Sequence, residues 1–241
     1  MVHNFSILLF CSVLLALGIY SIPSVWAHSG PSGHTHGGKS LSSCKPSKPA
    51  LSVKTATTRT KYVRTKSSKD LTQMHGGQGA SVGGLGGGEI GFKTESQFEI
   101  TQQGNSACVN LKRVQVTFYA KPEVHIASNF NRSTCEYNAV MAHEKGHIRI
   151  LRKFVREYSP KVKLELQRIA KKVKLTAGPI NKSEISAAQS KIQKKFMTEI
   201  EKYNEKIMPV LSKRQKAFDN PKEYARVAAK CKKWDQKLSK D

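Results

Sequence analysis

Two stretches in the middle of the chain alternate between apolar and polar residues, which is the pattern of a half-buried β-strand. Leu111–Tyr119 alternates most regularly, and Phe92–Thr101 alternates in part, so each predicts a strand. The apolar face of the first stretch carries Val114, Val116 and Phe118. Another apolar run, 124–127, follows Pro122 after a short turn at residues 120–121. We expect this run to fold back on Leu111–Tyr119 as a hairpin.

From Glu136 onward the apolar residues recur at helical spacing. The first helix is predicted over Glu136–Tyr158, with Ser133 or Thr134 as its N-cap. Pro160 is expected to end or kink this helix, because proline lacks an amide hydrogen and its ring clashes with the preceding turn.

Three further helices are predicted after Pro160, over residues 162–175, 185–218 and 222–234. Asp219-Asn220-Pro221 separates the last two, since proline is favoured at the start of a new helix. Strands precede helices along the chain, so the fold class is predicted to be α+β. We expect a small antiparallel sheet followed by a bundle of long helices.

The first third of the chain has a different composition. Residues 1–27 predict a secretory signal peptide, with an apolar run followed by small residues at a cleavage position; an uncleaved membrane anchor is the alternative. Residues 28–91 are rich in Gly, Ser, Thr, Lys and Pro and predict a disordered basic tail and linker. Its histidines either capture transition metals loosely or belong to ordinary solvated sequence. They are His28, His34 and His36.

The chain of 241 residues has a formal net charge of +24, with lysine and arginine spread along its length. Such a surplus favours non-specific binding to anionic surfaces. No signature of a nucleic-acid-binding module accompanies the charge, so specific nucleic-acid binding is not expected. Beyond the predicted signal peptide, no segment is apolar enough to predict a membrane span.

Residue identity and spacing together imply chemistry at His143-Glu144-Lys145-Gly146-His147. Two histidines four residues apart lie on one face of a helix, so both imidazoles can bind one metal ion, while Glu144 can take a proton from water. At about 100° per residue, all three side chains fall within the apolar stripe of the predicted helix. The motif therefore predicts a buried metal site with Glu144 as catalytic base. A pair of hydrogen-bonded core histidines is the alternative.

A catalytic zinc site has three protein ligands, and the motif supplies only two. No histidine follows His147, so the third ligand is either His125 or a downstream carboxylate. Glu157 lies too far along the motif helix, and the chain has not returned far enough at Glu165. The remaining carboxylates are Glu184, Glu199, Glu201, Asp219 and Glu223.

Four cysteines follow the predicted signal peptide, and an even number in an exported chain favours disulfides. If the hairpin turns at residues 120–121, Cys108 and Cys135 lie near its open end, and we predict that they pair. That bond would tie the sheet to the start of the motif helix. Cys231 then either stays free or pairs with Cys44.

The motif and its flanks resemble a known family. Residues 135–148, Cys-Glu-Tyr-Asn-Ala-Val-Met-Ala-His-Glu-Lys-Gly-His-Ile, resemble the motif helix of a bacterial family of secreted zinc-dependent proteases, which belongs with the zincin-like metallopeptidases. Members are similar to this chain in having short strands before the motif helix and a long helical segment after it. The resemblance covers about residues 90–235 and implies that residues 92–241 form a zincin-like catalytic domain with Zn²⁺ as its cofactor.

Many members of that family carry a later segment, Tyr-Asp-x-x-Thr-x-His-Gly. This chain has Phe218-Asp219-Asn220-Pro221-Lys222-Glu223-Tyr224 in the comparable place, without the Thr, His or Gly. The resemblance therefore leaves Asp219 or Glu223 to substitute as the third metal ligand.

Two functions from different classes follow from these observations. The first is an exported, periplasmic or secreted zinc metallopeptidase, a hydrolase that holds a peptide or protein substrate along an exposed strand. The second is a non-catalytic basic envelope protein with a structural or vestigial metal site. Metal content and proteolysis distinguish them.

Overall fold

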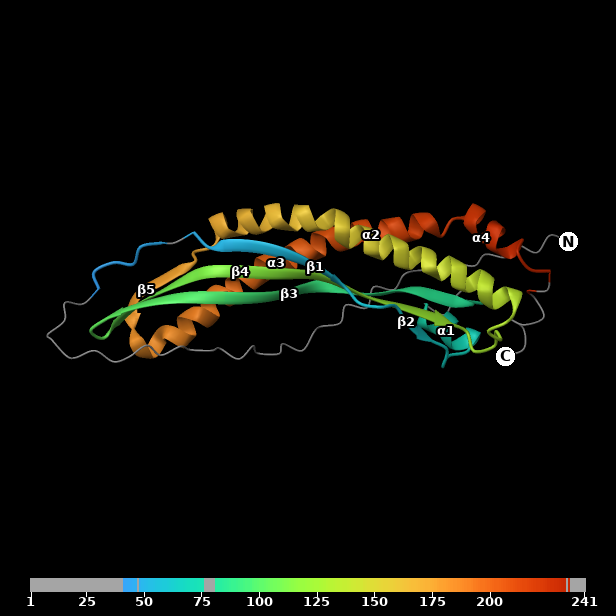
Figure 1. The fold of residues 1–241 in the computed structure, drawn as a ribbon, viewed down its shortest axis with the longest axis horizontal. Helices are drawn as coiled ribbons and strands as arrows, with labels where there is room; N and C mark the ends of the chain where they lie inside the picture. Colours follow the sequence, from blue (N-terminus) through green and yellow to red (C-terminus); the bar gives the residue numbers. More distant parts are fainter. Residues whose placement is uncertain (1–40, 47, 76–80, 233, 235–241) are drawn as a thin grey trace.

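The computed structural model describes residues 41–46, 48–75, 81–232 and 234. Within these residues, a five-stranded sheet packs through one face against two long helices (Figure 1). The predicted α+β class is confirmed, but the sheet is mixed and not purely antiparallel, because two of its strands join in parallel. The predicted signal peptide and the cluster of His28, His34 and His36 lie outside the described residues.

Strand β4 (Ser106–Ile126) is the central strand of the sheet. Along one edge it pairs antiparallel with β3 (Gly84–Gln103). Along its other edge lie three shorter strands in succession: β5 (Thr176–Asn181), antiparallel, then β1 (Ala50–Thr57) and β2 (Lys61–Val63), both parallel. Most of β4 therefore has a hydrogen-bonded partner on both sides.

A β-bulge in β4 decides which side chains face the helices. Gln97 of β3 pairs with Arg113, and Phe98 pairs with Leu111, which leaves Lys112 without a partner in β3. One extra residue shifts the alternation of the strand by one position. The buried apolar side chains on the face that follows this alternation are Ala107, Val109 and Leu111 before the bulge, and Val114, Val116, Phe118, Ala120, Val124 and Ile126 after it. Cys108 and Asn110, on the opposite face, are buried as well.

The predicted hairpin at residues 120–121 is wrong, because β4 continues through this point without a turn. Pro122 is tolerated because β1 ends opposite Ala120 and β2 begins opposite Glu123, so no strand pairs with that edge at the proline. The hairpin that does form joins β3 to β4 at Gly104, whose φ of 56° favours glycine.

Helix α2 (Cys135–Lys172) carries the motif and begins as predicted, since the hydroxyl of Thr134 accepts a hydrogen bond from the amide of Tyr137. The predicted break at Pro160 is wrong, because α2 continues through it. Tyr158 and Val162 are buried on either side of the proline, so both halves of the helix pack on the same core. Tertiary packing therefore overrides the local preference of proline.

The remaining helices connect the core to the end of the chain. Helix α3 (Ile185–Phe218) has the predicted bounds and follows a single turn of 3₁₀ helix, Lys182–Glu184. Helix α4 (Pro221–Ala228) starts after Asn220, whose side chain accepts from the amide of Glu223. It ends earlier than the predicted limit at residue 234.

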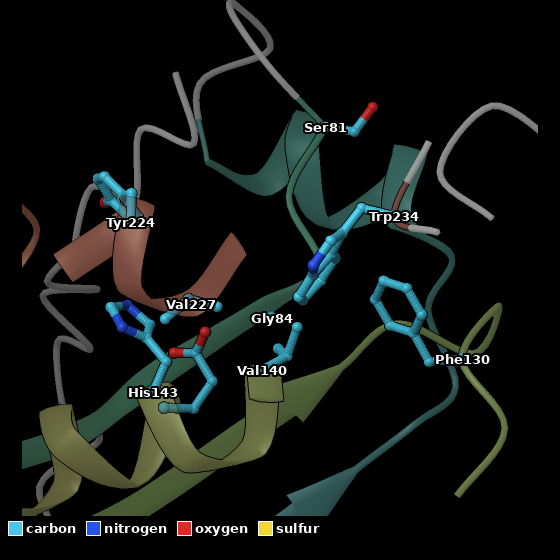
Figure 2. Close-up of a pocket in the computed structure, with 10 residues that line it drawn as sticks. Ser81, Gly84, Phe130, Val140, His143, Tyr224, Val227 and Trp234 are labelled. Atoms are coloured by element: carbon cyan, nitrogen blue, oxygen red, sulfur yellow. The ribbon is translucent and has the colours of Figure 1, made fainter. Parts of the chain in front are cut away.

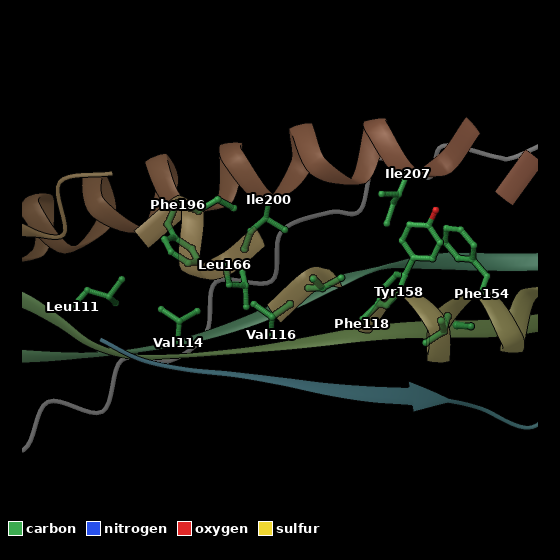
Figure 3. Packing of buried hydrophobic residues seen from close by; sticks show 14 of the residues in the cluster. Leu111, Val114, Val116, Phe118, Phe154, Tyr158, Leu166, Phe196, Ile200 and Ile207 are labelled. Atoms are coloured by element: carbon green, nitrogen blue, oxygen red, sulfur yellow. The ribbon is translucent and has the colours of Figure 1, made fainter. Parts of the chain in front are cut away.

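The main core lies where α2 and α3 meet β4 (Figure 3). At its centre, the ring of Phe118 stacks on Phe92 with centroids 4.7 Å apart and meets the edge of Phe154 at 6.3 Å. Helix α3 contributes Phe196, Ile200 and Ile207. The sheet and the two helices are therefore held together by one continuous apolar cluster.

The predicted disordered segment is wrong over much of its length, because β1, β2, α1 (Ser68–Met74) and the start of β3 fall between residues 50 and 91. Strand β1 is stabilised by the ladder it forms with β4, with Leu51 and Val53 packed against the core. Helix α1 has a capping box between Ser67 and Asp70. The composition of residues 28–91 did not predict that short strands in this segment pair with the edge of β4.

The predicted disulfide between Cys108 and Cys135 is also wrong. The structure pairs Cys44 with Cys108 and Cys135 with Cys231. Cys108 is at the start of β4 and Cys135 follows its end, so a strand that does not fold back separates them by roughly 60 Å at about 3.3 Å per residue. Two disulfides are compatible with an exported protein. Among the helices of the described residues, none is long and apolar enough to cross a membrane.

Replacing Phe118 by alanine should lower the free energy of unfolding by about 3–5 kcal/mol, because it leaves a cavity between β4 and α2. Urea unfolding followed by circular dichroism measures the change. Leu164→Ala on α2 is the control: Leu164 is 65% exposed, so its loss should change the free energy by no more than about 0.5 kcal/mol. Equal losses for the two variants would contradict this description of the core.

Candidate metal centre

The first turns of α2 bring His143, Glu144 and His147 to one buried face, as the sequence predicted. Their exposed fractions are 3%, 0% and 1%. Each offers one ligand atom, and these atoms lie within 4.8 Å of one another, so the group could hold a metal ion. The remaining question is which other side chains converge on the same point.

Asp219, the residue that ends α3, reaches the two histidines. Its Oδ1 lies 2.9 Å from Nε2 of His147 and 3.2 Å from Nε2 of His143. The two Nε2 atoms are 3.3 Å apart. Two ring nitrogens and one carboxylate oxygen therefore form a small triangle at the end of α3.

Hydrogen bonds at the outer ring nitrogens show which way the imidazoles are protonated. The amide nitrogen of Gln215 donates to the backbone carbonyl of His147, at 3.2 Å. Its oxygen is therefore the atom that faces Nδ1 of His147 at 2.6 Å, and Nδ1–H must donate. Nδ1 of His143 donates in the same way to Oε1 of Glu223, at 3.1 Å. Both Nε2 lone pairs are thus directed at Asp219.

Arg226 keeps Glu223 in the acceptor state that this arrangement needs. Its Nε donates to Oε2 of Glu223 at 2.6 Å, and its terminal nitrogen donates to Oε1. These bonds to Arg226 lower the pKa of Glu223 to about 2 and outweigh its burial, with the contact to His143 adding to the effect. An ionised Glu223 can only accept, so the proton on Nδ1 of His143 is assigned by its partner.

Three acceptor atoms that face each other at about 3 Å require a positive charge between them. Burial alone would raise the pKa of Asp219, but the two histidines outweigh it and bring the pKa below its ordinary value. Burial would lower the pKa of His147, yet Asp219 and Glu144 raise it. The triangle therefore favours a cation, either a proton on His147 or a metal ion.

Glu144 lies beside this triangle in a different environment. Complete burial raises the pKa of its carboxyl to about 8; His147 and the Gly86 amide oppose the rise, and Asp219 adds to it. Neither carboxylate oxygen has a partner that meets hydrogen-bond geometry. A buried carboxylate without a donor is costly, so it marks a functional position more than a structural one.

Two glycines of β3 let the strand approach Glu144. A Cβ atom at Gly84 would lie 2.8 Å from Oε1 of Glu144, and one at Gly86 would lie 2.6 Å from its backbone oxygen. The two glycines are two residues apart in a strand, so both face α2. The segment predicted as a flexible linker is therefore the part of β3 on which the motif helix rests.

Gly146 of the motif makes room for an aromatic ring. A Cβ atom there would lie 2.3 Å from the ring of Phe218. That ring stacks on His143 with centroids 5.0 Å apart and meets His147 edge-on at 5.1 Å. Phe218 precedes Asp219, so the close contact at Gly146 also places the carboxylate.

The candidates for the third ligand lie at different places, and they differ in which nitrogen of the two histidines they contact. Asp219 faces the inner nitrogens of both histidines, whereas Glu223 contacts only the outer nitrogen of His143. His125 instead pairs with Glu123 at 3.1 Å. Glu199 pairs with lysines on the surface, and Glu184 caps the turn before α3. Glu201 is exposed on α3.

Sequence reasoning missed Gln215 and the two glycines of β3. Gln215 continues the buried stripe of α3 after Ile207 and Leu211, at intervals of four residues. A polar residue in such a stripe, four positions before Asp219, was a usable signal. The glycines at 84 and 86 carried a signal too, in their spacing of two.

Comparisons of the chain with models of known protein families, with curated proteins and with solved structures found no match. The geometry of the site and the chemistry of its residues therefore carry the argument about function.

Gly86→Ala should lower the free energy of unfolding by about 1–3 kcal/mol, because the added methyl group collides with the backbone of Glu144. Gly87→Ala is the matched control, since strand alternation points position 87 away from α2. Thermal unfolding of both variants measures the difference. A Gly86→Ala protein as stable as the control would mean that β3 does not support the motif helix in this way.

Proposed function

We propose that this chain is an exported zinc metallopeptidase that hydrolyses peptide bonds. His143, His147 and Asp219 are its metal ligands, and Glu144 is its general base. The observation that carries the proposal is the triangle of three acceptor atoms, 2.9–3.3 Å apart, beside a buried carboxylate without a partner.

The donor set suits zinc. Zinc sites that catalyse hydrolysis combine three nitrogen or oxygen ligands at about 2.0–2.2 Å with one open position, in tetrahedral geometry. Ligand atoms at that radius lie roughly 3.3 Å from each other, close to the spacing of the triangle. Gln215 and Glu223 supply the outer hydrogen bonds that orient metal-binding histidines.

When bound, a zinc ion supplies a Lewis acid that polarises the scissile carbonyl and lowers the pKa of a water molecule. Glu144 would accept the proton of that water, because its carboxylate lies beside the histidines and has no partner that meets hydrogen-bond geometry. It would then return the proton to the leaving amine nitrogen. Gln215 and Glu223 keep the two imidazoles in the tautomer that presents Nε2 to the centre.

Strand β3 supports a peptide as the substrate. Among the described strands it pairs only with β4, so its other edge can take an extended chain as an added strand. Its residues Gly84 and Gly86 lie directly beside Glu144. The resemblance of residues 135–148 to secreted zinc-dependent proteases favours the same activity, and the two disulfides suit an exported enzyme.

A structural metal site in a non-catalytic basic envelope protein is the second candidate function. It is favoured by the burial of the ligands, since the side chains of His143, His147 and Asp219 are 4% exposed or less. A metal held in such a place contributes to folding. The net charge of +24 would suit attachment to anionic surfaces.

The two carboxylates near the histidines should differ in their effect on metal affinity. Glu223→Ala removes an outer hydrogen bond and should weaken zinc binding by about 10–100-fold. Asp219→Ala removes a ligand and should weaken it further. Competition with a chelating dye measures both, with exposed Lys222→Ala as the unchanged control. A larger loss for Glu223→Ala than for Asp219→Ala would exclude Asp219 as the ligand.

Glu144→Gln should keep its zinc and lose activity, because the amide has nearly the same shape but cannot accept the proton. We expect kcat/KM on an unstructured protein substrate to fall by about 10²–10⁴-fold. Zinc content is measured on the same samples. If the zinc-loaded wild type and the variant are equally inactive over a broad peptide panel, the peptidase is excluded and the structural site is favoured.

A further inference from the structure

The candidate catalytic centre is closed to a peptide in this structure. Glu144 is fully buried, and the cavity beside it has a volume of about 20 Å³, enough for about one water molecule. The apolar side chains of Phe130, Val140, Val227 and Trp234 form much of the cavity wall, and its polar lining residues are Ser81, His143, Glu144 and Tyr224. A substrate can reach Glu144 only if one of these walls moves.

Trp234 is the last of the lining residues in the sequence and lies after the end of α4. Figure 2 shows its indole beside Phe130 and over Gly84, with Val140 and Val227 on the other sides of the cavity. The rings of Trp234 and Phe130 meet edge-on with centroids 6.3 Å apart. The indole therefore occupies space next to the start of β3.

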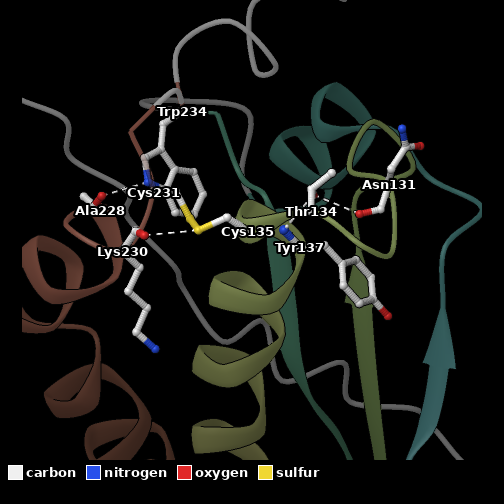
Figure 4. The surroundings of a disulfide bond; sticks show 8 residues. All are labelled: Asn131, Thr134, Cys135, Tyr137, Ala228, Lys230, Cys231 and Trp234. Carbon is white, nitrogen blue, oxygen red and sulfur yellow. Dashed lines mark hydrogen bonds between the residues drawn. A yellow bond between two sulfur atoms is a disulfide. The ribbon is translucent and has the colours of Figure 1, made fainter.

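Two bonds hold Trp234 in this place. Its Nε1 donates to the carbonyl of Ala228 at 2.8 Å, and Cys231, three residues earlier, is joined to Cys135 at the start of α2 (Figure 4). Within α4, only Val227 is buried, so this helix adds little apolar anchoring. The Cys135–Cys231 disulfide is thus the main tether of the indole.

The walls that remain without the indole define the ligand. Phe130, Val140 and Val227 would surround a pocket lined by apolar groups, and Glu144 would lie at its inner end. Such a pocket suits a large apolar or aromatic group, because apolar side chains form much of its wall and only a few polar groups, from Ser81, His143, Glu144 and Tyr224, reach it. Its opening beside Gly84 would receive a side chain from a peptide lying along β3.

We propose that this pocket binds a large apolar side chain of the substrate next to the scissile bond, and that Trp234 occupies the same place as an intramolecular plug tethered by Cys135–Cys231. This inference rests on the proposed peptidase function. Helix α4 keeps its contacts in the open state, so Glu223 continues to orient His143. Only the indole of Trp234 moves aside.

Trp234→Ala in the full-length, zinc-loaded protein tests the plug. We expect kcat/KM on peptides with phenylalanine beside the scissile bond to rise about tenfold. This is the gain if the open pocket is populated about one tenth of the time in the wild type and becomes the dominant state in the variant. Peptides with alanine at that position should gain less. Free indole should bind the variant and raise the variant's unfolding temperature, but it should not bind the wild type. Bound indole should also suppress the gain in activity of the variant.

A second variant keeps the test decisive if Trp234→Ala does not fold. Cys135→Ser with Cys231→Ser frees the segment while keeping the indole, and it should raise cleavage of the phenylalanine peptides as well. Cys44→Ser with Cys108→Ser removes the other disulfide and should leave the cleavage rate unchanged.

The two proposals fail in different ways. If the wild type cleaves phenylalanine peptides as fast as both opened variants, or indole does not bind Trp234→Ala, the plug is overturned. If indole binds but no zinc-loaded protein cleaves any peptide, the peptidase is overturned, and the pocket stands as an apolar binding site only.

Discussion

The site depends on one electrostatic constraint: three acceptor atoms from His143, His147 and Asp219 face each other within 2.9–3.3 Å in a buried place. Neutral histidines with their outer nitrogens protonated cannot satisfy this arrangement, because lone pairs would oppose lone pairs. A cation resolves the conflict. Every residue around the triangle, from Gln215 and Glu223 at the outer nitrogens to Arg226 behind Glu223, keeps the lone pairs directed inward.

The fold produces this constraint by joining distant parts of the chain. Helix α2 lies on β4 and on the glycine-rich start of β3, and α3 packs against the same core along its length. The end of α3 thereby reaches the motif, with Gln215 and Asp219 one helical turn apart. The Cys135–Cys231 disulfide then joins the segment after α4 to the start of α2 beside the site. The candidate metal centre is thus a consequence of packing over the whole domain.

The parts of this arrangement that depend on local pattern could be predicted from the sequence. His143 and His147 lie in the apolar stripe of a helix, and the bounds of α3 follow from its period and from Asn220-Pro221. The choice between Asp219 and Glu223 could not be made, because it depends on how α3 meets α2 in space. Composition marked residues 84–91 as a linker, since a glycine that permits close packing looks the same in sequence as one that permits flexibility.

The other errors have a common physical origin in the length of β4. A bulge at Lys112 interrupts the alternation of β4. Pro122 suggests a turn in the sequence, but the strand continues through it because neither β1 nor β2 pairs with β4 at this position. Once β4 was expected to fold back, Cys108 and Cys135 were placed together, while the structure holds them at opposite ends of the strand. Long-range pairing decided both points, and local sequence does not encode it.

The most direct test of the central claim is a crystal structure of the zinc-loaded protein, with anomalous difference density measured at the zinc absorption edge. The account predicts one peak about 2.0–2.2 Å from Nε2 of His143, Nε2 of His147 and Oδ1 of Asp219. No peak at the triangle, or a peak on the outer side of His143 bound by Glu223, would contradict it.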